Sequence, residues 1–344
     1  MPQTLDLIVQ PRLAPHRSLA ADEALLGELR AGARGGAGTL RVYDLPGDVL
    51  ALGRYHLAPG DEPAGGVTLW RRRSGGRAMP WGDGFVGLSL VLPHRSALVA
   101  SEPLALRPEQ VMNRCVRGIL GACEVSGVAA LYPGLDAVTV DRRIVALVSF
   151  DVDAAGALVF EAVIANTRDF SVLPALLDRA DPGGVVKAAM LTVDDTTCLA
   201  RALGRELTTE EVADRLRRGY ERRLDVSFVE RTAPPDLPFD ETRWLHTRTP
   251  RPEHDRHGSV ATRLGVLEAH FALEGGRLRD VLLAGDFIAS SPAVERLERR
   301  LGGRPAERGA IDAVVEEVLA EPESFVLGPP PGAVAEAILG GLPA

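Results

Sequence analysis

The 344-residue sequence predicts an α+β fold built as two units. Helix-like and strand-like segments alternate up to about residue 235, a proline-rich stretch follows, and a strand hairpin with two helices comes next. A chain of this length is also expected to form two domains. We therefore predict a larger unit over residues 1–235, a linker over 236–258 and a smaller α+β unit over 259–344.

The composition is that of an ordinary globular protein, with 46% hydrophobic and 25% charged residues and a net charge of -8. Its basic residues alternate with acidic ones, so the chain lacks the basic surface that nucleic-acid binding requires. No apolar run approaches the ~20 residues that cross a bilayer, and the N-terminus shows no signal pattern. We expect a cytoplasmic protein with neither a nucleic-acid nor a membrane partner.

Cysteine and histidine spacing predicts no metal site. Cys115, Cys123 and Cys198 show no CxxC pair, which argues against a disulfide framework or a zinc site. Three histidines fall between residues 246 and 257, in a stretch without strand or helix periodicity. That context favours an interdomain loop over a set of metal ligands.

The elements of the larger unit follow from caps, periodicity and turn residues. Ser18 and early acidic residues predict a helix over 18–32, and Thr208 with Glu211 predicts another over 208–224. Between them, two turns predict a meander of antiparallel strands over 136–165. Further segments are predicted as strands over 39–45, 48–53, 66–72 and 85–93 and as one amphipathic helix over 107–127.

The smaller unit begins with a predicted hairpin over 263–288 that turns at Gly275 and Gly276. Helices are predicted over 291–303 and 307–321. A hairpin followed by helices is typical of a small α+β domain.

The stretch "WRRRSGGRAMPWGDG", residues 70–84, is the strongest candidate for a binding site. Its two glycines, Gly75 and Gly76, allow the backbone to approach a ligand closely. The arginines at 71–73 and Arg77 can offer forked donors to a carboxylate or phosphate. A β-turn with solvated arginines is the alternative, and the stretch matches neither the P-loop nor the GxGxxG pattern.

Five segments in order resemble the lipoate-protein ligase A family of the biotin and lipoate ligase superfamily. The family's RRxSGGGAVxHDxGN signature appears as "RRRSGGRAMPWGDGF", after the helix "LAADEALL". "YPGLDAVTVDRRIVALVSF" stands where the family has a strand and the turn GRKISG, and "VKAAMLTVDDTTCLARAL" stands at its adenylate-contacting segment. Residues 264–303 resemble its accessory domain, including the "GDF" turn. The resemblance implies a mixed-sheet catalytic domain and a small α+β accessory domain.

That family activates lipoate with ATP and Mg²⁺ to lipoyl-adenylate, then transfers the lipoyl group to a lysine of a carrier domain. The resemblance therefore implies lipoate, ATP and Mg²⁺ as ligands and a lipoyl carrier domain as partner. It also implies a substrate and adenylate site made of Arg71, Arg72, Ser74, Gly75, Gly76, Arg77, Ala78, Asp83 and Asp136.

The family's catalytic lysine is absent. An ungapped alignment on the motif puts Ile144 at that position, whereas a one-residue gap puts Arg143 there. Arginine and lysine are not interchangeable at such a site, because one is a planar fork and the other a point charge. Lys187, the single lysine of the chain, is a second candidate catalytic residue.

Three functions remain open. The first is a divergent ligase, and the second is a catalytically impaired protein that binds lipoate, another acyl chain or a lipoyl carrier. The third is an octanoyl or lipoyl transferase, because the related octanoyltransferases also write the loop as "GGRA" and use a cysteine nucleophile. The matching region, residues 131–135, has no cysteine, and Cys123 is the nearest candidate.

Overall fold

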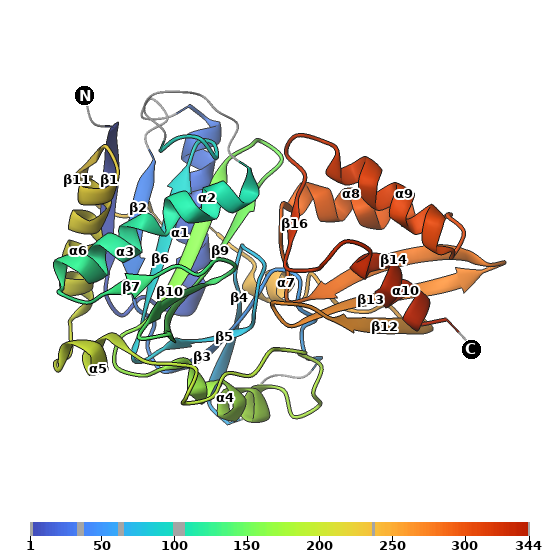
Figure 1. The fold of residues 1–344 in the computed structure, drawn as a ribbon, viewed down its shortest axis with the longest axis horizontal. Coiled ribbons are helices and arrows are strands. Elements are labelled where there is room, and N and C mark those ends of the chain that lie inside the picture. Colours follow the sequence, from blue (N-terminus) through green and yellow to red (C-terminus); the bar gives the residue numbers. More distant parts are fainter. Residues whose placement is uncertain (1–2, 33–37, 61–64, 99–106, 236–237, 343–344) are drawn as a thin grey trace.

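The computed structural model describes residues 3–32, 38–60, 65–98, 107–235 and 238–342. Two units lie side by side, a larger one up to β11 and a smaller one from β12 onward (Figure 1). The larger unit contains β1 (Gln3–Gln10), α1 (Pro15–Arg30), β2 (Thr39–Tyr43), β3 (Asp48–Leu52), β4 (Val67–Arg71), β5 (Met79–Gly82), β6 (Phe85–Leu92), α2 (Pro108–Cys115), α3 (Arg117–Val125), β7 (Ala130–Leu131), β8 (Ala137–Val140), β9 (Arg143–Val152), β10 (Leu158–Ala165), α4 (Leu173–Ala180), α5 (Leu199–Leu203), α6 (Thr209–Arg223) and β11 (Val226–Glu230).

A short helix, α7 (Glu241–Leu245), lies between the units. The smaller unit contains β12 (Arg256–Ala261), β13 (Val266–Glu274), β14 (Arg277–Gly285), β15 (Ile288–Ala289), α8 (Ser291–Leu301), α9 (Arg308–Leu319), β16 (Val326–Leu327) and α10 (Ala333–Gly340). Its antiparallel strands β12, β13 and β14 and its helices surround one apolar core.

The larger unit is built on a mixed sheet, which confirms the predicted α+β class. Eight strands lie in the order β11-β1-β2-β6-β10-β9-β8-β7, with β1 parallel to both of its neighbours and the other pairs antiparallel. A second sheet, in the order β4-β3-β5, combines a parallel and an antiparallel pair. Every residue of β6 and β10 is buried, because helices α2, α3 and α6 cover one face and α1 and the second sheet cover the other.

The predicted meander and hairpin turns are confirmed. Asp141 and Arg142 take positive φ angles of 48° and 65° between β8 and β9, as a two-residue hairpin turn demands. Gly275 and Gly276 do the same between β13 and β14, at 57° and 74°. Thr208 and Glu211 form the predicted capping box of α6.

Two local predictions were wrong. The helix expected over 107–127 divides at Val116 into α2 and α3, because α3 packs closely on α6 while α2 lies beside β9. The stretch before residue 258 was expected to lack regular structure, yet β12 begins at Arg256 and pairs with β13. Among the described residues, no helix has the length and apolar content of a membrane span.

Helices α3 and α6 cross at glycines, and this contact predicts a large effect of Gly219→Ala. A Cβ atom there would lie 2.3 Å from both the backbone nitrogen of Ala122 and the backbone oxygen of Gly118. We expect the substitution to lower the free energy of unfolding by about 1–3 kcal/mol, measured by urea denaturation. Gly27→Ala is the matched control, because its Cβ would meet nothing within 4 Å. An equal loss in both variants would contradict the packing argument.

Candidate functional site

The loop between β4 and β5, residues 72–78, is held in shape by its own arginine. The buried Arg72 guanidinium donates hydrogen bonds to the backbone oxygens of Gly75 (2.9 Å) and Arg77 (2.7 Å). The Ser149 hydroxyl donates a third bond to the Gly75 oxygen at 2.9 Å. The carbonyl groups of the loop therefore point toward the protein.

The other two arginines are also bound to protein groups. Arg71 is 1% exposed and donates to the backbone oxygens of Gly53, Arg54 and Leu245. Burial, with the nearby charges of Arg248 and Arg54, lowers the pKa of Arg71 to about 9. Arg73 forms an ion pair with Glu23. Arg71 and Arg73 therefore stabilise the loop through their bonds to other parts of the protein.

Ser74 occupies the centre of the loop. Its backbone N–H donates to the buried carboxylate of Glu161 at 2.6 Å, and burial raises the pKa of Glu161. The Ser74 hydroxyl and the Nε of Arg72 are both buried, and neither has a hydrogen-bond partner among the described residues. An unpaired buried polar group calls for a partner such as a water molecule or a ligand. The Ser74 hydroxyl and the Arg72 Nε are therefore available as hydrogen-bond donors to a ligand.

Arg77 ends the loop and reaches the meander. Its Nε donates to the Asp136 carboxylate at 2.5 Å, and both side chains are mostly buried, at 13% and 4% exposed. Burial raises the pKa of Asp136, whereas the Arg77 charge lowers it. The structure therefore brings together the predicted residues from Arg71 to Ala78 and Asp136.

A turn of the smaller unit covers the loop. The backbone N–H of Gly76 donates to the backbone oxygen of Phe287 at 2.7 Å. A Cβ atom on Gly75 would lie 2.2 Å from the same oxygen and 2.9 Å from the ring of Tyr55. The two rings of Tyr55 and Phe287 stack with their centroids 4.4 Å apart. Because Gly75 and Gly76 have no side chain, the turn of the smaller unit can contact the backbone of the loop directly.

Two other predicted site residues, Asp83 and Arg143, lie away from the loop. Asp83 is exposed and follows β5 at its far end, since Asp48 pairs with Gly82 there while Ala51 pairs with Met79 beside the loop. Arg143 is exposed and lies six strand residues, or ~20 Å, along β9 from Ser149.

Lys187 is also exposed, and its ammonium group donates to the Gly184 backbone oxygen at 2.6 Å. Its charge acts instead on Glu268 of the smaller unit. Burial raises the pKa of this carboxylate, and the charge of Lys187 opposes that shift.

Core residues occupy the positions where the family signature has histidine and asparagine. Trp81 is 1% exposed, meets Trp70 edge-on with centroids 4.9 Å apart and stacks on Tyr43. Phe85 packs against Phe170 with centroids 5.5 Å apart. Trp81 and Phe85 are thus members of one apolar core cluster.

The cysteines lack the environment of a nucleophile. All three are buried, and burial raises the pKa of Cys115 and of Cys123 to about 12. A reactive thiol needs a lowered pKa and partial exposure. Neither feature is present at these two positions.

The histidines do not assemble a metal centre. His254 lies 3.2 Å from an Asp280 carboxylate oxygen, and His257 stacks on His270 with ring centroids 5.8 Å apart. In the part of the chain that the structure describes, no three His, Cys, Asp or Glu side chains are placed to hold a metal ion.

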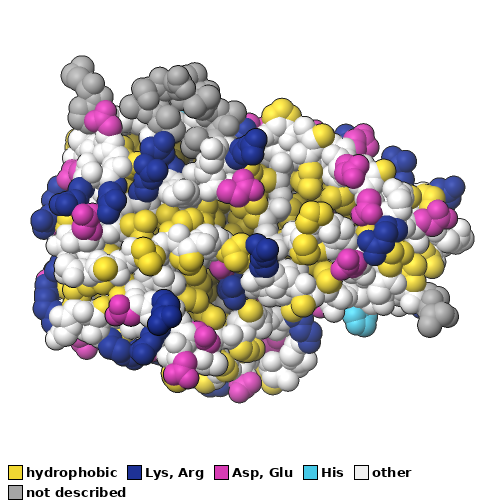
Figure 2. Space-filling view, viewed as in Figure 1, with side chains coloured by type: hydrophobic (Ala, Val, Ile, Leu, Met, Phe, Trp, Pro, Cys, Tyr) yellow, Lys and Arg dark blue, Asp and Glu magenta, His cyan; other side chains and the backbone are white. Residues whose placement is uncertain are grey.

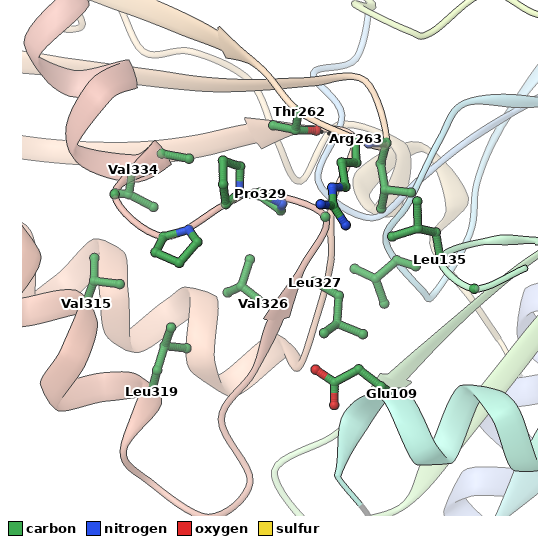
Figure 3. Close-up of a pocket in the computed structure, with 18 of the residues that line it drawn as sticks. Glu109, Leu135, Thr262, Arg263, Val315, Leu319, Val326, Leu327, Pro329 and Val334 are labelled. Carbon is green, nitrogen blue, oxygen red and sulfur yellow. Dashed lines mark hydrogen bonds between the residues drawn. The ribbon is translucent and has the colours of Figure 1, made fainter.

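An apolar cleft opens between the two units, next to the covered loop. Figure 2 shows apolar side chains on both sides of the junction, and Figure 3 shows Arg263 and Leu135 reaching into the cleft from its rim. The cleft measures about 1430 Å³ and is lined by Leu135 of the larger unit and Ile288 of the turn. Leu135 has a φ of +62°, is 44% exposed and directly precedes Asp136. The cleft therefore borders the loop without including it.

Sequence reasoning missed His56 and Asp286 as a pair. The imidazole Nδ1 of His56 accepts from the backbone N–H of Gly53 at 3.0 Å, and its Nε2 donates to the Asp286 carboxylate at 3.0 Å. Both side chains are buried, although 230 residues separate them. The "GDF" turn was noted as a family feature, but no local signal linked it to His56.

The fold of this chain is similar to that of solved lipoate ligases. LipL1 of P. falciparum, solved with lipoate, is 13% identical, and the match covers 92% of this chain and 100% of that chain with a TM-score of 0.64. Lipoate-protein ligase A with ATP bound is 19% identical, with 71% and 93% covered and a TM-score of 0.52.

A bi-partite lipoate protein ligase from Thermoplasma acidophilum, described with its E2 lipoyl domain, is 18% identical. The match covers 70% of this chain and 91% of that chain with a TM-score of 0.51. No protein-family model and no curated protein sequence matches this chain. The chain has the fold of the lipoate ligases, as its sequence predicts.

Proposed function

We propose that the protein binds lipoate or a similar acyl acid at the loop of residues 72–78 and works as a lipoate-protein ligase. ATP, accompanied by Mg²⁺, converts the acid to an acyl-adenylate, and a carrier-domain lysine then takes the acyl group. One observation carries the proposal, namely a glycine loop with unpaired buried donors at Ser74 and Arg72. Its support is the fold, which is shared along the full length of a lipoate-bound ligase.

The residues of the loop fit oxyanions of an acid or a phosphate. The Gly76 N–H, the Ser74 hydroxyl and the free Nε of Arg72 are all donors within a few residues of one another. Donors held in place before the reaction stabilise charge that develops during acyl transfer. In activation, a carboxylate oxygen bonds to the α-phosphorus and pyrophosphate leaves. In transfer, the lysine amine bonds to the acyl carbon, and AMP and a proton leave.

A binding protein that does not activate the acid is the second candidate. Arg143 and Lys187, the two candidates for the missing lysine, are both exposed, and Arg143 lies apart from the covered loop. Trp81 has replaced the signature histidine within the core. These positions favour a protein that still binds the acid but no longer activates it. The transferase alternative has less support, because burial raises the pKa of Cys123, its only candidate nucleophile.

Lipoate-dependent exchange of pyrophosphate into ATP separates the ligase from the binding protein. We expect exchange above a protein-free control when ATP, Mg²⁺ and lipoate are present together. Arg143→Ala and Lys187→Ala test the two candidates for the missing lysine: loss of exchange in one variant assigns the positive charge at the adenylate to that residue, and exchange that survives excludes it from the role. No exchange, with lipoate binding still measurable by calorimetry, would exclude the ligase and leave the binding protein.

A further inference from the structure

We propose that His56 and Asp286 form a latch through which the smaller unit holds the loop closed, so that ligands reach the loop only after this turn has moved away. The inference concerns regulation of the site and rests on the proposed function for its ligand. The turn is defined here as residues 285–291, which join β14 to α8.

The turn occupies the Gly76 N–H, a hydrogen-bond donor that a bound anion would need. The oxygen of Phe287 accepts from the N–H of Gly76, so this donor is already paired in the closed form. The Ser74 hydroxyl and the Arg72 Nε remain unpaired but have almost no exposed surface. Binding sites with fully enclosed donors need an opening step before a ligand can enter. The closed form is therefore a resting form of the loop.

His56 joins the loop to the turn. On one side it accepts from Gly53 N–H, and a Cβ on Gly53 would lie only 2.3 Å from the Gly76 oxygen. On the other side it donates to Asp286, whose second carboxylate oxygen accepts from the backbone N–H of Val266 at 3.0 Å. The His56 imidazole thus fixes the backbone beside the loop, and it bonds to Asp286 only while the smaller unit is docked.

Further contacts hold the two ends of the turn. At its start, the Gly285 N–H donates to the Tyr55 backbone oxygen at 3.1 Å. At its end, the backbone N–H and hydroxyl of Ser291 donate to the two oxygens of Asp151, at 2.8 and 3.0 Å. Asp151 is buried in the larger unit. These bonds all cross between the units, so they break together when the turn leaves.

Two substitutions at His56 test its hydrogen bonds to Gly53 and Asp286 separately. His56→Asn retains an acceptor near the Nδ1 position for Gly53 but loses the donor to Asp286, whereas His56→Gln retains a donor near Nε2. We expect the backbone amides of Gly76 and Gly285 to exchange with deuterium about tenfold faster in His56→Asn, because one buried charge-assisted hydrogen bond is lost. His56→Gln should stay near the wild-type rate. His94→Asn, at an exposed histidine, is the matched control.

The outcomes are separable. Unchanged exchange at Gly76 in a folded His56→Asn protein would overturn the latch. Equally faster exchange in strands β6 and β10 would also overturn it, since His56 would then support the whole unit. A calorimetric titration with lipoate should show tighter binding to His56→Asn, because less closed form competes. If neither protein binds lipoate but the exchange difference is present, the latch stands and the proposed function fails.

Discussion

Replacement of Arg77 by methionine is expected to lower the free energy of unfolding by about 3–5 kcal/mol, because it leaves the buried Asp136 carboxylate without its counter-charge. The methionine fills most of the same volume, so the loss reports on charge. Chemical denaturation at pH 8 measures it. Asp136→Asn in the same background should recover much of the loss, because the buried charge is then gone.

The pH dependence of the Arg77→Met variant follows from the same pair. Burial already raises the pKa of Asp136 while Arg77 opposes the shift, so loss of the arginine raises this pKa further. The folded state then holds the proton more tightly than the unfolded chain does, and stability falls as pH rises through the folded pKa. The deficit relative to wild type should be small near pH ~4 and complete at pH 8. A deficit that does not vary with pH would contradict the assignment.

Gly75→Val is expected to separate the two units. Its Cβ would lie 2.2 Å from the Phe287 backbone oxygen and 2.9 Å from the Tyr55 ring, which stacks on Phe287. We therefore expect the turn to leave the loop, at a cost of about 1–3 kcal/mol. Small-angle X-ray scattering should show a larger radius of gyration. Gly60→Ala is the control, since its Cβ would meet nothing within 4 Å; equal radii for wild type and Gly75→Val would contradict the close contact.

Local patterns predicted most of the elements. The meander, the capping box of α6 and the hairpin at Gly275 were readable because each depends on residues close in sequence. The parallel pairing of β1 with β11 was missed because it joins Gln3 to Val226 across the whole larger unit. The short helix α10 was also missed, since it lies in an Ala- and Gly-rich segment with few periodic polar residues.

The position of the loop was predictable, but the roles of its side chains were not. The arginines were expected to face a ligand, yet their partners are distant in sequence, such as Leu245 for Arg71 and Asp136 for Arg77. Asp83 was expected near the loop because it is near in sequence. The pairing of β3 with β5 places it at the opposite end of the sheet. The roles of Arg143 and Lys187 stay predictions.

A crystal structure of the protein with lipoate bound tests the central claim most directly. We predict lipoate density beside residues 72–78, with its carboxylate within hydrogen-bond distance of the Gly76 N–H and with the Phe287 oxygen displaced from that group. Lipoate bound only in the apolar cleft, with the bond between Gly76 and Phe287 intact, would contradict both the proposed binding loop and its closure by the smaller unit.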